Sequence, residues 1–339
     1  MKKLILIDGN AMLHRAYHAM PELTNKKGEM VNAVYGFFSM FLQILNDQNP
    51  DYVAVCFDRS KPTIRQSMYA GYHAHRPEMA SDLTPQVALV DELLEKMNVK
   101  IFSLDGYEGD DLIGTIAAKV QNTQSSRISE SQSIRNSEKS DTPIHRQSEF
   151  SKSSENIEVV IVTGDRDMLQ LVNENVKVLM PQNGLGKTVL YDEAKVEEKY
   201  GVKSSQFIDY KALIGDPSDG YPGVSGIGPK TAATLLGQFG TFENLYTKID
   251  EVPQKYALKL ATDAEQAALA KKLATIITDV PMQFSLENCS CSDFDLVSLH
   301  EGFLEHGFKS LVSRLETRYP ELKKTLEEKQ SGKSQLSLL

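Results

Sequence analysis

Leu4-Ile5-Leu6-Ile7-Asp8 is a short aliphatic run that ends at a single carboxylate. Comparable runs, rich in β-branched residues, follow at 52–57, 100–104, 159–162 and 176–179. Such runs, separated by longer segments with helical spacing, are typical of a parallel sheet built from βαβ units. The sequence therefore predicts an α/β fold with a central, mostly parallel sheet flanked by helices. The expected helices lie at 31–47, 84–97, 109–121 and 166–174.

Length and composition restrict the class of protein. With 339 residues, of which 41% are hydrophobic, the chain can bury a sizeable core. The first apolar run stops at Asp8, too soon for a signal peptide, and no stretch is long enough to cross a membrane. Cys56, Cys289 and Cys291 provide neither a disulfide framework nor good zinc spacing. We expect a cytoplasmic monomer with no membrane partner.

The chain divides into three predicted parts. Residues 1–185 form the α/β domain, 186–318 a mostly helical domain, and 319–339 a flexible tail. Within the first domain, 121–156 is crowded with Ser, Asn, Gln and alternating charges, a composition that buries too little to become ordered. We interpret 121–156 as a disordered insertion, either a spacer or a docking segment.

Carboxylates follow the predicted strands. Asp8 ends the first strand and Asp58 the second, and the remaining ones are Glu108, Asp110 and Asp111 after the third and Asp165 and Asp167 after the fourth. The carboxyl ends of parallel strands meet at one edge of a sheet, where α/β proteins bind ligands. Any single Asp in such a place could simply cap a helix. The repetition after every strand favours a common site.

So many carboxylates at close quarters require cations between them, because like charges raise one another's pKa. No histidine lies beside Asp8, Asp58 or Glu108, which favours Mg²⁺ or Mn²⁺ over zinc. Two such ions would support phosphodiester hydrolysis. Asp216 and Asp219 follow in Gly-Asp-Pro-Ser-Asp-Gly, which is either a plain turn or a further source of metal ligands.

Six motifs resemble those of one enzyme family. They are Leu6-Ile7-Asp8-Gly9-Asn10, Ala33-Val34-Tyr35-Gly36-Phe37, Phe57-Asp58, Gly106-Tyr107-Glu108-Gly109-Asp110-Asp111, Thr163-Gly164-Asp165-Arg166-Asp167 and Gly223-Val224-Ser225-Gly226-Ile227-Gly228-Pro229-Lys230-Thr231-Ala232. The sequence resembles the bacterial 5′-3′ exonuclease and flap endonuclease family, that is, the 5′ nuclease domain of DNA polymerase I and its stand-alone relatives. The resemblance covers most of residues 2–315. It implies a PIN-like 5′ nuclease fold followed by a helix-hairpin-helix motif at about 211–240.

The resemblance also implies a function and a ligand set. It implies 5′-3′ exonuclease and 5′ flap endonuclease activity on nicked, gapped or flapped DNA in replication and repair, with two Mg²⁺ ions or Mn²⁺ as a substitute. The implied ligands are Asp8, Asp58, Glu108 and Asp110 for the first ion and Asp165, Asp167 and Asp219 for the second, with Asp111 and Asp216 in supporting places.

Two strings depart from the family pattern. The family's Tyr-Lys-x-x-Arg motif appears here as Tyr72-His73-Ala74-His75-Arg76, with His73 in place of the lysine. The resemblance therefore implies His73 and Arg76 as cationic catalytic residues. It also implies Arg15, on the first helix, as a third. His73 carries a charge only when it is protonated. An Asp-Asn-x-Pro-Gly string becomes Asp219-Gly220-Tyr221-Pro222-Gly223. For Arg15, a surface salt bridge remains an alternative.

Two regions are expected to bind DNA. Residues 59–77 carry basic and aromatic side chains without any acid, including Arg65 and Tyr72, which suits single-stranded DNA or, alternatively, a solvated helix face. The predicted hairpin provides Gly226, Gly228, Lys230 and Thr231 at a helix start, where amides can bind a phosphate. The resemblance implies duplex binding there and a K⁺ ion; a plain helical corner is the alternative.

The last residues, Gln335-Leu336-Ser337-Leu338-Leu339, resemble the short peptide by which bacterial replication proteins bind the sliding clamp. We expect clamp binding through Gln335, Leu336, Leu338 and Leu339. Two other functions remain open at this point. One is a non-catalytic DNA-binding accessory protein that docks on the clamp, and the other is a PIN-type ribonuclease, which the hairpin and the length of the chain disfavour.

Overall fold

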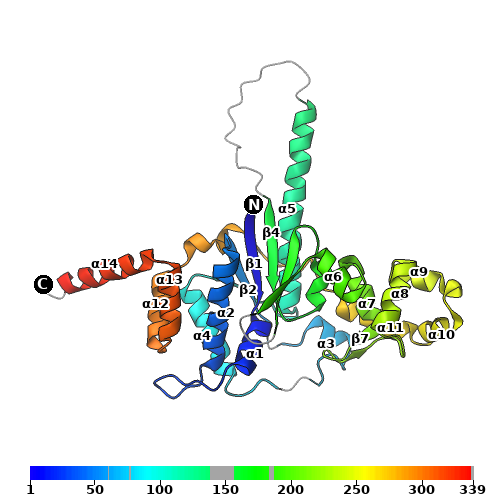
Figure 1. Ribbon diagram of the computed structural model, residues 1–339, viewed down its shortest axis with the longest axis horizontal. Helices are drawn as coiled ribbons and strands as arrows, with labels where there is room; N and C mark the ends of the chain where they lie inside the picture. The colour runs from blue at the N-terminus through cyan, green and yellow to red at the C-terminus, as the bar shows by residue number, and fades with distance from the viewer. Residues whose placement is uncertain (60, 76–77, 138–155, 183–186, 337–339) are drawn as a thin grey trace.

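A computed structural model describes residues 1–59, 61–75, 78–137, 156–182 and 187–336, with the backbone alone over 124–137 and 330–336 (Figure 1). No helix in these segments combines the length and the apolar character that a membrane crossing requires. Helices and strands alternate through the first half of the chain, whereas helices dominate the second half.

The centre of the molecule is a six-stranded sheet with the strand order β3-β2-β1-β4-β5-β6. The first five strands are parallel and β6 pairs antiparallel with β5, so the predicted mostly parallel sheet is confirmed. The strands are β1 (Lys2–Asp8), β2 (Tyr52–Cys56), β3 (Lys100–Phe102), β4 (Ile157–Val162), β5 (Val176–Pro181) and β6 (Thr188–Tyr191). In the register of β1 and β2, Asp8 lies opposite Cys56, which brings Asp8 close to Asp58.

Both faces of the sheet are covered, so the middle of the central strand β1 is a continuous run of buried apolar residues. Ile5 and Ile7 of β1 face one core, and Leu4 and Leu6 face the other; all four are fully buried. The first core is covered by α1 (Gly9–Ala19), α2 (Asn32–Gln48) and α4 (Thr84–Lys96). The second core is covered by α5 (Gly109–Ser137) and continues into the helical domain.

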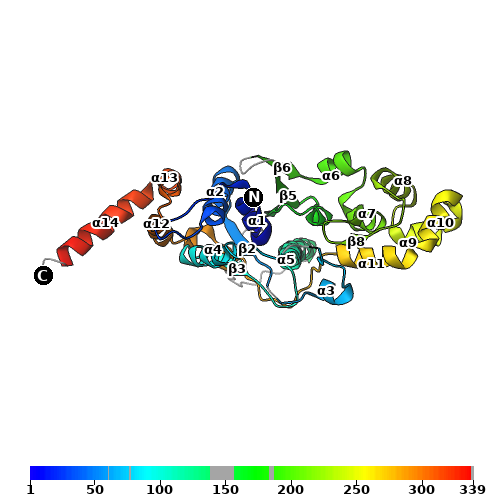
Figure 2. The ribbon, with the colours of Figure 1, turned by 90° about the horizontal axis from the view of Figure 1, so that it is seen from below.

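The helical domain lies beside the β6 edge of the sheet (Figures 1 and 2). Its elements are α6 (Glu193–Tyr200), α7 (Phe207–Ile214), the hairpin of β7 (Gly215–Asp216) and β8 (Tyr221–Pro222), α8 (Pro229–Phe239), α9 (Phe242–Thr247), α10 (Gln254–Thr262) and α11 (Ala264–Ala274). Helices α7 and α8 pack together around the turn that joins them, and the pair spans residues 207–239, beside the predicted motif at about 211–240.

The predicted domain boundaries need two corrections. The boundary at 185/186 is too early, because β6 still belongs to the sheet. The predicted helical domain also ends too late. Helices α12 (Leu296–Glu305) and α13 (Lys309–Arg318) return to the α/β domain and pack on α4 and α2, where Phe303 and Leu311 are fully buried.

Two segments predicted to lack structure are partly helical. Helix α5 continues through the first part of the 121–156 insertion to Ser137, because a helix that is already nucleated extends at little cost even with polar residues; 138–155 lie outside the described residues. The predicted tail forms α14 (Glu321–Leu336), which is fastened to the first core by the buried Leu322.

Candidate active site

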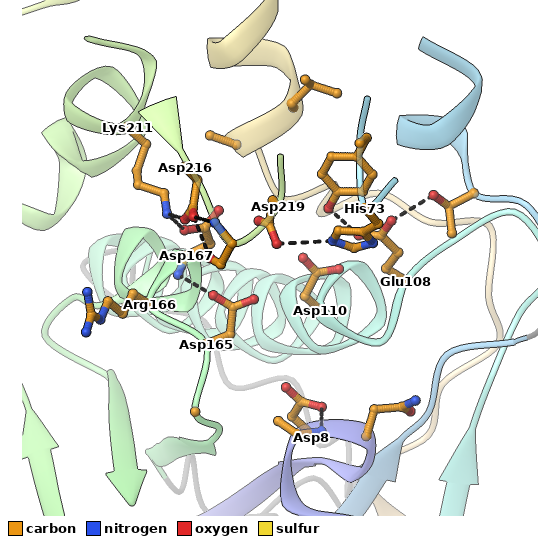
Figure 3. A pocket seen from close by; sticks show the side chains of 18 of the residues that line it. Asp8, His73, Glu108, Asp110, Asp165, Arg166, Asp167, Lys211, Asp216 and Asp219 are labelled. Carbon is orange, nitrogen blue, oxygen red and sulfur yellow. Dashed lines mark hydrogen bonds and ion pairs between the residues drawn. The ribbon is translucent and has the colours of Figure 1, made fainter. Parts of the chain in front are cut away.

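A cavity of about 1030 Å³ lies at the carboxyl edge of the parallel strands, between the sheet and the helical domain (Figure 3). Eight of the nine predicted metal ligands line it, and Asp111 does not. We call Asp8, Asp58, Glu108 and Asp110 the first acid set. We call Asp165, Asp167, Asp216 and Asp219 the second acid set.

Asp8 lies where β1 ends and caps helix α1. Its Oδ1 accepts a hydrogen bond from the Ala11 amide at 2.9 Å, and its Oδ2 accepts one from Thr163 Oγ1 at 2.7 Å. Burial raises the pKa of Asp8 to about 7, and the neighbouring carboxylates of Asp58 and Asp165 act in the same direction. Asp8 therefore caps helix α1 and also lies where it could bind a metal ion, so the two predicted roles do not exclude each other.

Glu108 and Asp110 stand at the start of α5. Glu108 accepts hydrogen bonds from Thr63 Oγ1 at 2.7 Å and from the Tyr72 hydroxyl at 3.0 Å, and it is 7% exposed. Burial raises the pKa of both carboxyls, although the Arg65 guanidinium opposes this. The amide of Gly109 binds Asp58 Oδ1 at 2.6 Å, which connects the end of β2 to the same helix start.

Arg65 and Asp111 form a buried pair behind the cavity. The terminal nitrogens Nη1 and Nη2 of Arg65 donate to the two oxygens of Asp111 at 2.9 and 2.7 Å, and Nη1 also donates to Glu108 at 3.0 Å. Only 3% of Arg65 is exposed, so the prediction that it binds DNA is wrong. Asp111 is 1% exposed and its oxygens are fully engaged, which gives it a supporting place and not that of a ligand.

Asp165 and Asp167 follow β4 where we expected an α-helix over 166–174. The chain instead forms a short 3-10 helix, Asp167–Leu171. Asp165 Oδ1 accepts a hydrogen bond from the Asp167 amide at 2.9 Å. Burial raises the pKa of Asp167 to about 8, with the Asp165 carboxylate as the next cause, and burial also raises the pKa of Asp165.

Lys211 is the residue of this site that the sequence analysis missed. It lies on α7 and is 6% exposed. Its Nζ is 2.5 Å from Asp167 Oδ1 and also contacts Asp216, as Figure 3 shows. The signal was present in the sequence, since a lysine inside a mostly apolar helix is expected to be buried and then needs an acidic partner.

His73 connects the 59–77 segment to the second acid set. Its Nε2 is 3.1 Å from Asp219 Oδ1, and its amide donates to the Asp219 carbonyl at 2.8 Å (Figure 3). Its ring stacks on Tyr72 with centroids 3.9 Å apart. Tyr72 lines the cavity but is 6% exposed, so little of its ring is available to DNA bases. Arg76 lies outside the described residues.

The other predicted residues lie apart from the acid sets. The structure does not bring Arg15 into the cavity, although the preceding His14 lines it. At the start of α8, which belongs to the predicted helix-hairpin-helix motif, Gly228 is the N-cap residue. Lys230 is exposed there, as an approach to DNA requires. The Gly226 carbonyl accepts a hydrogen bond from Lys259 Nζ at 3.1 Å, so a K⁺ ion there would meet an ammonium group of the chain.

Only part of the predicted clamp-binding peptide lies within the described residues. Gln335 and Leu336 belong to the end of α14, whereas Leu338 and Leu339 lie outside the described residues. Figure 2 shows α14 extending away from the sheet and the helical domain. Clamp binding therefore stays a prediction.

The donor chemistry of the cavity fits divalent cations. Oxygens of Asp167, Asp216 and Asp219 all lie within 4.8 Å of one another. The acid sets offer carboxylate oxygens, which are the ligands that hard cations such as Mg²⁺ and Mn²⁺ prefer. Burial raises the pKa of Asp8 and Asp167, and neighbouring carboxylates add to this; bound cations would favour the ionised form of both carboxyls.

Comparison with known proteins gives matches along most of the chain. Curated relatives include DNA polymerase I of Caldicellulosiruptor bescii, 38% identical over 315 residues, and that of Bacillus subtilis, 35% identical over 315 residues. These alignments cover 92% and 93% of this chain but 33% and 32% of the relatives. The chain thus spans about a third of their length.

Solved structures share the fold at low sequence identity. A bacteriophage T5 flap endonuclease in a pseudo-enzyme-product complex with DNA and metal ions has a TM-score of 0.59 and 18% identity, covering 93% of this chain and 100% of that chain. T5 5′-exonuclease with bound zinc ions has a TM-score of 0.58 and 18% identity, covering 93% of this chain and 98% of that chain.

Two family profiles match consecutive parts of the sequence. Residues 3–131 and 140–201 match the 5′-3′ exonuclease N-terminal resolvase-like domain, and residues 202–296 match the 5′-3′ exonuclease C-terminal SAM fold. The boundary between the two profiles falls after β6 and α6, as the sheet requires. The chain therefore belongs to the 5′-3′ exonuclease family of phosphodiester hydrolases.

Proposed function

We propose that the chain cleaves DNA from 5′ ends as a 5′-3′ exonuclease and at 5′ flaps as a structure-specific endonuclease, in replication and repair. One observation carries the proposal: eight carboxylates from two domains line a single cavity at the carboxyl edge of the sheet. Membership of the exonuclease family and the likeness to a flap endonuclease fold support it.

Two Mg²⁺ ions fit the donors of the cavity, with Mn²⁺ as a substitute. The first acid set would hold one ion and the second acid set the other. When bound, such ions activate a water molecule and stabilise the leaving oxygen of a phosphodiester. Asp8 and Asp167, whose pKa values are raised, would each release a proton from a carboxyl oxygen as a cation binds.

The residues around the acid sets orient ligands and substrate. Thr163 and the Ala11 amide fix the Asp8 carboxylate, and the Gly109 amide fixes that of Asp58. Arg166 is exposed and lines the cavity beside Asp165, where its guanidinium can bind a phosphate of the substrate. Lys61, an exposed residue of the 59–77 segment at the same cavity, offers a second cation and pairs with Asp105 at the surface.

A cleavage assay tests the proposal. Purified protein is incubated with nicked, gapped and 5′-flapped duplexes, with Mg²⁺, with Mn²⁺ or with a chelator. We expect cleavage with either ion and none with the chelator. Asp167→Asn should lower the rate at least a hundredfold without weakening flap binding, whereas Glu198→Gln, an exposed acid on α6, should leave it unchanged. Normal flap binding without cleavage by the unaltered protein would contradict the proposal and favour an accessory DNA-binding protein.

The same assay separates a deoxyribonuclease from a ribonuclease. Matched flaps carrying a DNA or an RNA 5′ strand are compared at equal concentration. We expect the DNA flap to be cut, because the hairpin at α8 is suited to the backbone of a duplex next to the cavity. Cleavage confined to the RNA strand would instead support the PIN-type ribonuclease.

We also propose that Gln335 to Leu339 bind the sliding clamp. The position of Gln335 and Leu336 at the end of α14 supports this, since α14 extends away from the sheet and the helical domain (Figure 2). Deletion of 335–339 should abolish binding to immobilised clamp and leave basal flap cleavage unchanged. Undiminished clamp affinity of the shortened protein would refute the proposal.

A further inference from the structure

Tyr72 and His73 are consecutive residues that reach different acid sets. The Tyr72 hydroxyl donates to Glu108 Oε2 at 3.0 Å, and His73 Nε2 is 3.1 Å from Asp219 Oδ1. Their rings stack, and Tyr72 also stacks on Tyr221 with centroids 6.5 Å apart. A single dipeptide therefore bridges the start of α5 in the α/β domain and the β7–β8 turn of the helical domain.

The backbone of Gly71, which leads into this dipeptide, and the His73 amide pack against Gly220. A Cβ added at Gly220 would lie 2.6 Å from the Gly71 carbonyl oxygen and 3.8 Å from the His73 nitrogen. Because the nearest atom belongs to the main chain, no side-chain movement could relieve that contact. Gly220 also has a φ of +81°, in the left-handed region that favours glycine. The close approach thus depends on the absence of a side chain at 220.

His73 itself has a strained backbone. Its φ is +58°, which is uncommon for a residue with a side chain and persists only when its surroundings impose it. The hydrogen bond from its amide to the Asp219 carbonyl at 2.8 Å supplies that constraint. His73 and Gly220 are also the positions where the sequence departs from the family strings, so the two departures meet at one contact.

We propose that Tyr72 and His73, docked on the backbone of Gly220, form a strut that fixes the separation of the two acid sets. Tyr72 positions Glu108 and His73 positions Asp219, and neither contact requires a substrate to be present. The strut is a positioning device for the two cation sites and rests on the proposed two-ion function. Its consequence is that occupation of the second site depends on residues 71–73, which belong to the α/β domain.

Mn²⁺ binding to the purified protein tests the strut without DNA. Calorimetry gives the number and affinity of sites, and electron paramagnetic resonance reports the magnetic coupling of two neighbouring Mn²⁺ ions. Asp58→Asn and Asp167→Asn identify which component of the isotherm belongs to which acid set. We expect two coupled ions in the unaltered protein. Fewer than two would refute the two-ion function itself, independently of the strut.

Three variants then probe the strut. His73→Phe keeps a stacked ring without the hydrogen bond and should weaken the second site about tenfold, leaving the first within about twofold. Tyr72→Phe should affect only the first site, and by no more than about threefold, because Thr63 and Arg65 also hold Glu108. Gly220→Ala should weaken the second site and abolish the coupling of the two ions.

Gly307→Ala is the matched control, because Gly307 has a φ of +77° but open space around its Cβ position. It imposes the same backbone strain without a contact and should leave both sites unchanged. In the Gly220→Ala background, His73→Phe should add less than twofold, because the dipeptide has already left its place. Unaltered ion coupling and affinities in folded Gly220→Ala and His73→Phe proteins, checked by circular dichroism, would overturn the proposal.

Discussion

A single ammonium group stands among the carboxylates of the second acid set. Lys211 Nζ contacts Asp167 and Asp216, and the lysine side chain is almost fully buried. A buried charge is costly unless it is paired, and the two carboxylates supply the partners of this ammonium group. In the absence of divalent ions, the ammonium group in turn neutralises part of the negative charge of the acid set. The same contacts place Lys211 in competition with a cation for the oxygens of Asp167.

Replacement of Lys211 should therefore lower the stability of the metal-free protein and increase the stabilisation that Mg²⁺ provides. Lys211→Met leaves the buried Asp167 without its cationic partner and should lower the free energy of unfolding of the metal-free protein by about 3–5 kcal/mol. The stabilisation by Mg²⁺ should become larger than in the unaltered protein. Thermal unfolding with and without Mg²⁺ measures both, and Lys195→Met, at an exposed pair, serves as the control. An equal Mg²⁺ effect in both proteins would contradict the competition.

The raised pKa values of Asp8 and Asp167 predict a pH dependence of stability. Both carboxyls have an ordinary value of 3.8, and in the folded protein they titrate near 7 and 8. Between these values the folded state binds more protons than the unfolded state, so stability falls as pH rises from about 4 to 8. The melting temperature of the metal-free protein should fall by several degrees between pH 5 and pH 8. A flatter profile is expected for Asp167→Asn, and an unchanged slope in that variant would refute the assignment.

At the scale of elements, Arg65 joins three segments that are far apart in the sequence. It lies on α3 (Ile64–Met68), pairs with Glu108 and Asp111 at the start of α5, and donates to the carbonyls of Leu273 and Thr275 where α11 ends. Donors at a helix C-terminus satisfy carbonyls that have no partner within the helix. Arg65 thus holds the α/β domain and the helical domain together directly behind the cavity.

Loss of this junction should destabilise the whole protein. Arg65→Met removes the partner of buried carboxylates and should lower the free energy of unfolding by about 3–5 kcal/mol. Arg59→Met is the matched control, because Arg59 is exposed and pairs only at the surface with Asp105, a contact worth about 0–1 kcal/mol. Urea unfolding followed by circular dichroism compares the two. Similar midpoints for both variants would show that the junction is dispensable.

The elements also show what the sequence can predict. Strand ends and their carboxylates were predictable because periodicity and a terminal Asp are local signals, as at Asp8 and Asp165. The role of Arg65 was not predictable, since its partners lie up to 210 positions away and only the fold brings them together. A basic residue within a basic segment gives no local sign of being buried. The packing of α12 and α13 on the first domain was not predictable either, because only the fold brings these helices to α4 and α2.

At the scale of the whole molecule, α12 and α13 close the core of the α/β domain. The family profiles end at residue 296, yet Leu299, Phe303 and Leu311 beyond that point are fully buried against α2 and α4. Each such side chain contributes about 1.5–3 kcal/mol through burial. The segment after the matched domains is therefore part of the folded unit in this chain.

Truncation tests this role. A protein ending at residue 295 exposes the apolar surface of α2 and α4 and should melt at least about 5 °C lower, or aggregate, since 1 kcal/mol corresponds to about 2–4 °C. A protein ending at residue 329 retains Leu322 and should melt like the complete chain. Differential scanning calorimetry of both proteins gives the comparison. Equal melting temperatures would mean that α12 and α13 are peripheral.

Helix α14 extends from the body on the side opposite the helical domain (Figure 2). With 16 residues at about 1.5 Å each, it spans roughly 24 Å. A partner bound at its end would act as a tether that keeps the cavity within a few nanometres of an anchoring point. Short tethers of this kind produce effective concentrations in the millimolar range. Under the proposed function, an anchored nuclease would then meet successive 5′ ends on one DNA molecule by local search and not by diffusion from bulk solution.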